Sequence, residues 1–316
     1  MKTGSGKYEQ LLALCSGLAP ATTAVAHPCE ASALTGAMDA ARLRLIQPIL
    51  VGPSAKIAAV AKECGLALDG IRVVDVPHSH AAATRAVELV RAGEAEVLMK
   101  GSLHTDELMS AVVSKELGLR TGRRISHVFL MDVPTYPKVL IITDGAINIA
   151  PTLEDKVDIV QNAIDLARSL DVALPKVAIL SAVETVTSKM QSTIDAAALC
   201  KMAERGQITG GLLDGPLAFD NAISREAART KGIRSEVAGD PDILLAPDLE
   251  SGNGLAKQLS FLANADSAGL VLGARVPIIL TSRADSVRSR TASCGVALRM
   301  VHARRRAAQS SAESGA

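Results

Sequence analysis

The sequence predicts a two-domain α/β fold in which mostly parallel, partly mixed sheets are covered by helices. Short aliphatic runs alternate with amphipathic stretches along almost the whole chain, which is the pattern of α/β proteins. Most of the runs lack a strict polar alternation, as expected of strands that are buried on both faces. A chain of 316 residues is also long enough for two hydrophobic cores.

The expected strands are runs rich in Val, Ile, Leu and Ala that end in turn residues. They span residues 22–26, 46–51, 71–76, 96–99, 127–131, 139–143, 176–180, 211–213, 243–245, 268–272 and 277–280. Because the runs at 127–131 and 139–143 are joined by a short loop, we expect them to pair antiparallel, which would make one sheet mixed.

The expected helices have apolar residues three to four positions apart, so that one face of each helix is hydrophobic. Val157, Val160, Ile164 and Ala167 lie on one such face. The helices are expected at residues 31–45, 53–64, 80–91, 106–117, 153–170, 188–203 and 254–263, with a further helix beginning near Ser286.

The composition excludes some classes of partner. With Trp 0, Tyr 2 and Phe 3, the core is expected to be aliphatic, and a site that stacks nucleic-acid bases on aromatic rings is disfavoured. The formal net charge of +1 gives no overall field for polyanions. We therefore expect small-molecule substrates and no nucleic acid.

Cysteine and histidine usage indicates a reduced protein without a structural metal. The five cysteines are isolated, with no C-x-x-C pair, which is typical of a cytoplasmic chain. The six histidines form no zinc-binding motif. No apolar run approaches the length of about 18 residues that a membrane span needs. We expect a soluble cytoplasmic protein with no metal site.

Basic side chains are concentrated near the end of the chain. Residues 275–306 contain eight arginines against one acid, Asp285. Such a surface can attract an anionic small molecule. For the run 304–306 we favour the simpler interpretation that these arginines end a helix and complement its dipole.

The most informative segment is residues 278–287, IILTSRADSV. An apolar strand ends here, and Thr281, Ser282, Arg283 and Asp285 occupy the expected turn before a helix. Carboxyl ends of strands bind ligands in open α/β sheets, and a helix start suits phosphate. A hydroxyl, a guanidinium and a carboxylate at one turn could orient a substrate, bind an anion and accept a proton. The alternative is a simple helix cap, which would not require Arg283.

The segment 97–106, VLMKGSLHTD, has the same order of strand, turn and helix. Gly101 would let a ligand approach the backbone closely. Lys100 supplies positive charge, and Ser102 and Thr105 could donate hydrogen bonds to phosphate oxygens. His104 is a possible base, although a lone histidine is more often structural.

Two further acidic segments have both a functional and a structural interpretation. Asp144 and Asn148, in ITDGAIN at 142–148, could line a cleft, but turns use Asp-Gly and Asn for backbone reasons alone. Asp240, Asp242 and Asp248 could bind a metal, but Asp-Pro-Asp is also ordinary turn chemistry, and we favour the turn.

Taken together, these segments resemble the phosphate acetyl/butyryltransferase family, closest to its butyryltransferase-like branch, from about residue 28 to about residue 298. The motifs on which the resemblance rests are KGSLH at 100–104, FLMDVP at 129–134, ITDGAIN at 142–148, LS at 180–181, DGPLAFD at 214–220, AGD at 238–240, LESGN at 249–253 and TSRADS at 281–286.

The resemblance implies a fold like that of isocitrate and isopropylmalate dehydrogenases, with an active site in the cleft between two domains. The first domain would comprise residues 1–126 and 267–316, and the second residues 127–266. The implied reaction is reversible transfer of a short acyl group, acetyl or butyryl, between coenzyme A and inorganic phosphate. Both are substrates, and no tightly bound cofactor or metal is implied. Members are typically homodimers or larger assemblies.

The resemblance also implies roles for individual residues. Ser282, Arg283 and Asp285 would be catalytic, with Arg283 on the phosphate and Asp285 as the base for the thiol. The substrate-binding residues would be Lys100, Gly101, Ser102, His104, Thr105, Asp144, Asn148, Thr281 and Arg288.

The chain departs from the acetyl-specific members of the family at two positions. Those members have an acid seven residues after the serine, where this chain has Ser289. They also have an arginine in the region of Met109 and Ser110, for which Lys100 could substitute.

Two other functions are compatible with the same residues. One is a metal- and NAD-dependent decarboxylating dehydrogenase of the same fold, supported by Asp240, Asp242 and Asp248 alone. The other is a weakly active protein that binds coenzyme A or an acyl phosphate. Because aromatic residues are so few, we expect the adenine of coenzyme A to contact aliphatic or arginine surfaces, and its phosphates to contact basic groups and turn N–H groups.

Overall fold

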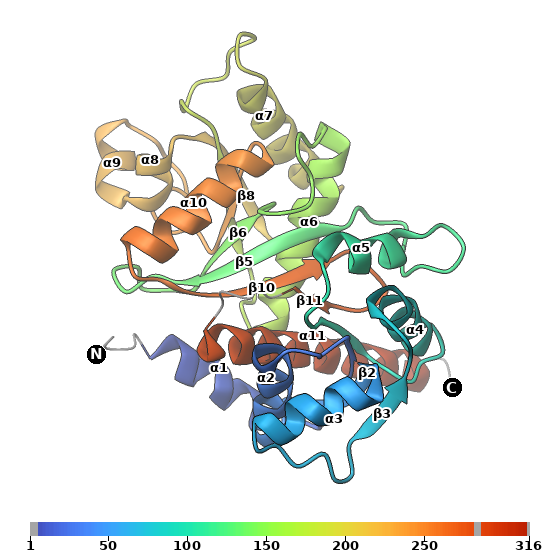
Figure 1. Ribbon diagram of the computed structural model, residues 1–316. Helices are drawn as coiled ribbons and strands as arrows, with labels where there is room; N and C mark the ends of the chain where they lie inside the picture. The colour runs from blue at the N-terminus through green and yellow to red at the C-terminus, as the bar shows by residue number, and fades with distance from the viewer. Residues whose placement is uncertain (1–5, 281–285, 315–316) are drawn as a thin grey trace. The chain divides into compact units, whose positions relative to one another are not determined.

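A computed structural model describes residues 6–280 and 286–314. The chain divides into two compact units, each of which is described by itself. The first unit comprises Glu9–Arg123 and Ala268–Ala316, and the second comprises Met1–Tyr8 and Arg124–Ser267. The helices and strands are labelled in Figure 1.

The sheet of the first unit has the order β3-β2-β1-β4-β11-β10. Its strands are parallel except for β10, which runs antiparallel to β11. The strands are β1 (Ala21–Ala26), β2 (Ile46–Gly52), β3 (Arg72–Asp75), β4 (Val97–Lys100), β10 (Asp266–Leu272) and β11 (Ile278–Ile279).

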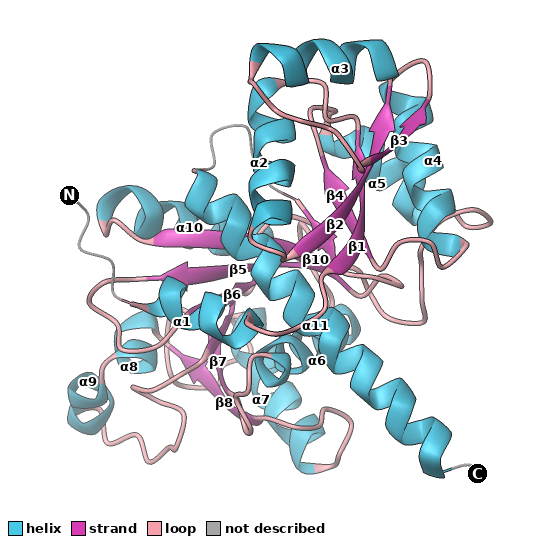
Figure 2. Cartoon of the chain, turned by 90° about the horizontal axis from the view of Figure 1, so that it is seen from below, coloured by secondary structure: helices cyan, strands magenta, loops and turns pink. Residues whose placement is uncertain are grey.

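Helices cover both faces of this sheet. Figure 2 shows α2 and α3 on one side of β1 and β2, and α4 and α5 on the other. The strand order requires this arrangement, because the chain moves outward from β1 to β3 and then crosses back to β4, and such crossovers are right-handed. The helices are α1 (Lys7–Cys15), α2 (Ala31–Arg42), α3 (Ser54–Glu63), α4 (Ser79–Arg91), α5 (Thr105–Val113) and α11 (Val287–Ser314).

The sheet of the second unit has the order β5-β6-β9-β7-β8. The predicted hairpin is confirmed, since β5 pairs antiparallel with β6, whereas the other pairs are parallel. The strands are β5 (Ser126–Asp132), β6 (Leu140–Thr143), β7 (Lys176–Leu180), β8 (Leu212–Leu217) and β9 (Ile243–Leu245). The helices are α6 (Leu153–Ser169), α7 (Gln191–Glu204), α8 (Phe219–Ile223), α9 (Arg225–Thr230) and α10 (Leu249–Leu262).

The α/β class and the mixed sheets agree with the prediction, and the differences have local causes. Helix α10 begins at Leu249, five residues before the predicted start, because the side chain of Asp248 accepts a hydrogen bond from the Ser251 N–H at 2.8 Å and caps the helix there. The sequence pattern missed α1, α8 and α9, of which α8 and α9 are too short to show a helical period.

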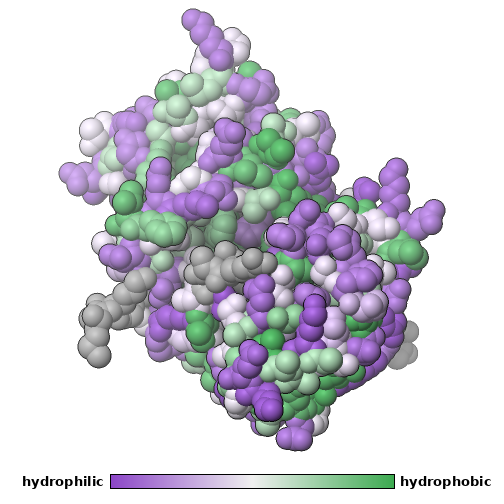
Figure 3. All heavy atoms as spheres, in the orientation of Figure 1, coloured by the Kyte–Doolittle hydropathy of each residue, from purple (hydrophilic) through white to green (hydrophobic). Residues whose placement is uncertain are grey.

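The core is aliphatic, as expected. Among the five aromatic residues only Tyr136 is buried, at 9% exposure, and the largest fully buried side chains are Leu, Ile and Met. Most of the face drawn in Figure 3 is hydrophilic, with separate hydrophobic patches. Among the described residues, no helix combines the length and apolar character that crossing a membrane requires.

Candidate active site

The carboxyl ends of five parallel strands, β1, β2, β3, β4 and β11, lie at one edge of the sheet of the first unit. β1 pairs with β2 and β4, and β4 pairs with β11 so that Met99 is opposite Ile279. This is the edge at which open α/β sheets bind ligands. The residues that directly follow β1 and β4 are therefore candidates for a site.

The central part of the predicted site follows β11 and cannot be placed. Thr281, Ser282, Arg283 and Asp285 lie outside the described residues, so their roles stay predictions. The helix predicted near Ser286 is confirmed, because α11 begins at Val287.

The first turn of α11 contains two residues that bear on the predicted chemistry. Ser289 accepts a hydrogen bond on its hydroxyl from Ser286 Oγ at 3.1 Å and is 9% exposed. Arg288 forms an ion pair with Glu9, with an N–O distance of 3.0 Å. Hydrogen bonding to Arg288 lowers the pKa of Glu9. A phosphate at Arg288 would have to compete with this carboxylate.

The turn after β4 approaches the end of β1 so closely that only glycine fits at position 101. A Cβ atom there would lie 2.4 Å from the carbonyl oxygen of Ala26 and 2.6 Å from that of His27. The close approach allows the Gly101 N–H to donate to Ala26 O and the Ser102 N–H to donate to His27 O, both at 2.9 Å. The predicted close backbone approach at Gly101 is therefore present, and here its partner is the backbone of β1.

The side chain of Ser102 fixes the same junction. Its hydroxyl donates to the His27 carbonyl at 2.7 Å and accepts from the Cys29 N–H at 3.1 Å. The hydroxyl oxygen also lies 3.3 Å from His27 Nδ1. Ser102 thus positions the imidazole of His27 beside the ends of β1 and β4.

His27 is a candidate that the sequence analysis missed. Burial lowers its pKa, and the nearby charge of Lys56 lowers it further, so the ring is held in its neutral form near pH 7. The residue adopts a positive φ of 55°, a conformation that non-glycine residues rarely occupy. It could have been found from its place directly after the predicted strand at 22–26.

The remaining predicted residues of this turn differ in exposure. Lys100 is only 8% exposed, and its ammonium lies 3.5 Å from the Gly101 carbonyl oxygen. His104 and Thr105 are exposed at the start of α5. His104 is the N-cap residue of α5, and its side chain accepts no hydrogen bond from the helix. The N–H groups of the first helical turn therefore have no side-chain cap.

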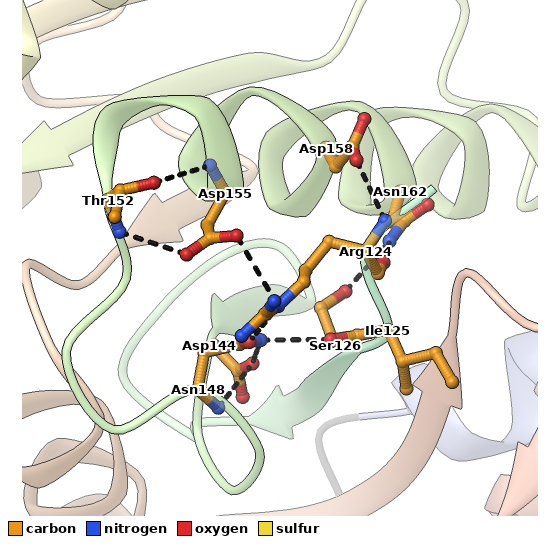
Figure 4. Close-up of polar contacts among 9 residues, drawn as sticks. All are labelled: Arg124, Ile125, Ser126, Asp144, Asn148, Thr152, Asp155, Asp158 and Asn162. Atoms are coloured by element: carbon orange, nitrogen blue, oxygen red, sulfur yellow. Dashed lines mark hydrogen bonds and ion pairs between the residues drawn. The ribbon is translucent and has the colours of Figure 1, made fainter. Parts of the chain in front are cut away.

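The second unit contains the turn with Asp144, which is drawn in Figure 4. One carboxylate oxygen of Asp144 accepts from the N–H groups of Ala146 and Ile147 at 2.9 and 3.1 Å. The other oxygen accepts from both the backbone and the side-chain nitrogen of Asn148. Asp144 is 2% exposed. Its carboxylate therefore organises the turn itself.

Asn148 is bound just as fully. Its side-chain nitrogen also donates to Ile125 O at 2.9 Å, and its side-chain oxygen accepts from Arg124 Nε at 2.7 Å. Figure 4 shows Arg124 between this amide and Asp155 of α6. The Arg124 Nε lies 3.4 Å from a carboxylate oxygen of Asp155. The contacts of Asp144 and Asn148 are those of the turn interpretation, and a role for either residue in binding substrate stays a prediction.

Each of the three acids proposed for a metal is already engaged: Asp240 and Asp242 are paired with cations, and Asp248 caps α10. Asp240 contacts Lys138, Lys176 and Arg225 at 2.8 to 3.1 Å. Burial raises the pKa of Asp240, but hydrogen bonds from Lys176 and Lys138 outweigh burial and lower it to about 2. No cluster of three or more His, Cys, Asp or Glu side chains suited to a metal occurs among the residues that the structure describes.

Comparison with known proteins supplies a family for these features. Residues 78–294 match the model of the family described as Phosphate acetyl/butaryl transferase. The chain is 66% identical over 303 residues to the phosphate acetyltransferase of Rhizobium meliloti, covering 96% of both chains. It is 40% identical over 293 residues to the phosphate butyryltransferase of Clostridium beijerinckii, covering 93% of this chain and 97% of the relative.

A solved structure is similar over nearly the same length. The branched-chain phosphotransacylase of Enterococcus faecalis V583 superimposes with a TM-score of 0.78 at 31% identity. The match covers 89% of this chain and 99% of that one.

Proposed function

Because the chain belongs to the phosphate acetyl/butyryltransferase family, we propose that it is a phosphate acyltransferase whose preferred acyl group is acetyl. The observation behind this choice is the 66% identity to a phosphate acetyltransferase over 303 residues, against 40% to a phosphate butyryltransferase over 293. The comparisons establish the family and the acyltransferase class. The length of the acyl chain is what we propose.

The reaction is a reversible exchange in which acyl-CoA and inorganic phosphate give acyl phosphate and coenzyme A. In the direction that starts from acyl phosphate, the thiolate of coenzyme A attacks the carbonyl carbon of the acyl phosphate. A C–S bond forms, the C–O bond to phosphate breaks, and the thiol proton passes to a base on the protein. A thiolate is required because the thiol is a poor nucleophile. No tightly bound cofactor is needed for these steps.

We assign the base and the anion contact to the segment after β11. Asp285 would take the thiol proton, and Arg283 would bind the phosphate and stabilise the charge that develops on the acyl oxygen. Support for a site at this edge comes from β4, which pairs with β11 and ends in Lys100. The start of α5, five residues after Lys100, has no side-chain cap and offers N–H groups for a phosphate, against which the acids Asp106 and Glu107 of its first turn act.

We further infer that the protein acts in the cytoplasm as a homodimer or larger homo-oligomer, with the units functioning as two domains of an isocitrate dehydrogenase-like fold. All five cysteines are free, in keeping with a reducing compartment. Light scattering coupled to size-exclusion chromatography measures the assembly directly, and a monomer would contradict this inference.

Comparing acyl substrates tests the acyl preference. We expect kcat/KM for acetyl-CoA with phosphate to exceed that for butyryl-CoA at least tenfold, since each methylene in an apolar pocket is worth about 10- to 200-fold in discrimination. Propionyl-CoA should fall between them. A preference for butyryl-CoA would show that the acyl assignment is wrong while leaving the reaction class intact.

Substituting Arg283 tests the anion contact. We expect Arg283→Ala to lower kcat by about 100- to 1000-fold, the usual cost of removing one group that stabilises charge in the transition state. Arg85→Ala is the matched control, because Arg85 is an exposed arginine of α4 that pairs with Glu88. The unfolding midpoints of both variants should match that of the unmodified protein. A normal rate for Arg283→Ala would remove the assignment.

A further inference from the structure

The second unit contains a cavity of about 830 Å³ that no residue of the proposed mechanism lines. It lies among the starts of α6, α7, α8 and α10 and includes Leu180 and Ser181 at the end of β7. Figure 1 shows these four helices gathered within the second unit. The volume falls within the range of about 300–1000 Å³ that is usual for small-molecule sites.

The lining is mainly apolar. The lining also contains neutral hydrogen-bonding groups: Gln191, which donates to Asp195, Ser192, whose hydroxyl is hydrogen-bonded to that of Ser181, and Gln258. A few polar groups on an apolar wall are typical of pockets that orient a largely uncharged ligand. The apolar side chains include Pro151, Leu180, Met190, Phe219, Pro247 and Leu255.

The charged groups of the cavity are already satisfied by the protein. Lys156 and Asp195 form a buried ion pair at 2.6 Å, with side-chain exposures of 6% and 7%. Gln191 donates to the other oxygen of Asp195 at 2.8 Å. Asp248 accepts from the Ser251 N–H and caps α10. The charged side chains of the lining are therefore one lysine and two acids, and each is already engaged within the protein, so none is available to hold a phosphate group.

The exposed ring of Phe219 indicates that the cavity suits a flat ligand. It lines the cavity, yet 43% of its surface is exposed to solvent in a protein that has only three phenylalanines. An exposed ring beside an apolar cavity offers a flat face on which another ring can stack. Among the parts of coenzyme A, only adenine is a flat ring, and it is uncharged near pH 7.

We propose that this cavity binds the adenine of coenzyme A, with the ring stacked on Phe219 and its edge hydrogen-bonded by Gln258. The proposal rests on the proposed function for the identity of the ligand. It revises the expectation from composition that adenine would contact aliphatic or arginine surfaces alone.

Two thiol substrates separate adenine binding from binding of the rest of the molecule. Coenzyme A and pantetheine have the same thiol arm, but pantetheine has no nucleotide. We expect Phe219→Ala to raise KM for coenzyme A about tenfold in the reaction with acetyl phosphate. Replacing an aromatic residue that stacks on a base by alanine usually weakens binding by about this much. The kcat/KM of the Phe219→Ala variant for pantetheine should equal that of the unmodified enzyme. Phe219→Tyr, which keeps the ring, should retain the original KM for coenzyme A.

Phe261→Ala is the matched control, because Phe261 is 82% exposed on α10 and does not line the cavity. It should leave both substrates unaffected. An equal loss of kcat/KM for coenzyme A and pantetheine in Phe219→Ala would overturn the proposal, and so would an unchanged KM for coenzyme A.

Calorimetric titration with coenzyme A separates failure of this proposal from failure of the proposed function. If the unmodified protein binds coenzyme A but catalyses no transfer, the proposed function is wrong. The adenine site is then still tested by comparing affinities, because Phe219→Ala should bind coenzyme A roughly tenfold more weakly than the unmodified protein. Equal affinity of the two proteins would overturn the adenine site even in an active enzyme. Circular dichroism confirms that each variant is folded.

Discussion

Two turns of this protein have the same order of sequence features but different chemistry. Each follows a buried strand, contains a glycine and polar residues, and precedes a helix: residues 100–105 in the first unit and residues 144–148 in the second. In the second turn, Asp144 and Asn148 are bound to groups of their own unit. In the first, Ser102 is bound in this way, whereas His104 and Thr105 are exposed at an uncapped helix start.

The difference shows why polar residues at the end of a strand do not identify a site by themselves. A side chain whose acceptors and donors are already engaged must lose those bonds before it can hold a ligand. A polar side chain that has no hydrogen-bond partner in the protein, at the start of a helix without a side-chain cap, breaks no such bond when it binds a ligand. The first turn is therefore the better candidate for phosphate, and the second turn is the better candidate for a structural role.

The largest expected effect on stability is that of Asp144→Ala. The substitution removes the acceptor of several N–H groups, including two buried ones on Asn148, and should lower the free energy of unfolding by about 3 kcal/mol or more. Denaturant unfolding measures the change, and the folded fraction should keep its kcat. An unchanged midpoint with lost activity would show instead that Asp144 acts on the substrate.

A second effect involves His127, which contacts the same turn. Burial lowers the pKa of its ring to about 4, although the charge of Asp144 acts in the opposite direction. The unfolded chain therefore binds more protons than the folded one between about pH 6.5 and 4, so stability is complete above this window and is lost as the pH falls through it. From pH 7 to pH 5 the loss should be about 2 kcal/mol.

Unfolding curves at the two pH values test this expectation, with His127→Leu as the comparison. The leucine variant should lose less stability than the unmodified protein over the same interval. If both lose the same amount, the buried imidazole is not the group that titrates.

A smaller effect is expected for Ser102→Ala. The hydroxyl bridges His27 and Cys29, and its loss should cost about 1 kcal/mol of stability because the part-buried Cys29 N–H loses one of its two acceptors. If Ser102 serves only to hold the junction of β1 and β4, the loss should appear in stability with KM for phosphate unchanged, and Ser102→Thr should restore part of it. A large rise in KM for phosphate with unchanged stability would indicate direct contact with the substrate.

The smallest effect on stability is expected for His104→Ala. Exposed residues without partners usually change stability by less than about 0.5 kcal/mol. If the open turn binds phosphate, KM for phosphate should rise severalfold while the unfolding midpoint stays constant. An unchanged KM would remove His104 from the site and weaken the contrast between the two turns.

Much of the fold was predictable because it depends on periodic patterns. Alternating buried strands and amphipathic helices predicted the α/β class, and the short loop after residue 131 predicted the antiparallel pair of β5 and β6. The start of α10 was missed because one capping interaction of Asp248 determines it. Such a local bond leaves no periodic trace in the sequence.

The site was less predictable, because its members come from distant parts of the chain. The strand-end rule found Lys100 and Gly101, but nothing local indicated that His27 would meet Ser102 across 75 positions. Conversely, Asp144 had the residue type of a catalytic acid, and only its hydrogen bonds show that it organises a turn. The residue type shows which reactions a side chain could take part in, and its hydrogen-bond partners show whether it has a catalytic or a structural role.

The most direct test of the acyltransferase function is the release of coenzyme A from acetyl-CoA. Thiol titration with and without inorganic phosphate, in the presence of a metal chelator, measures this release. We predict rapid thiol formation that requires phosphate, is unaffected by the chelator and is accompanied by an equal amount of acetyl phosphate. Thiol formation without phosphate, or none with it, would contradict the account.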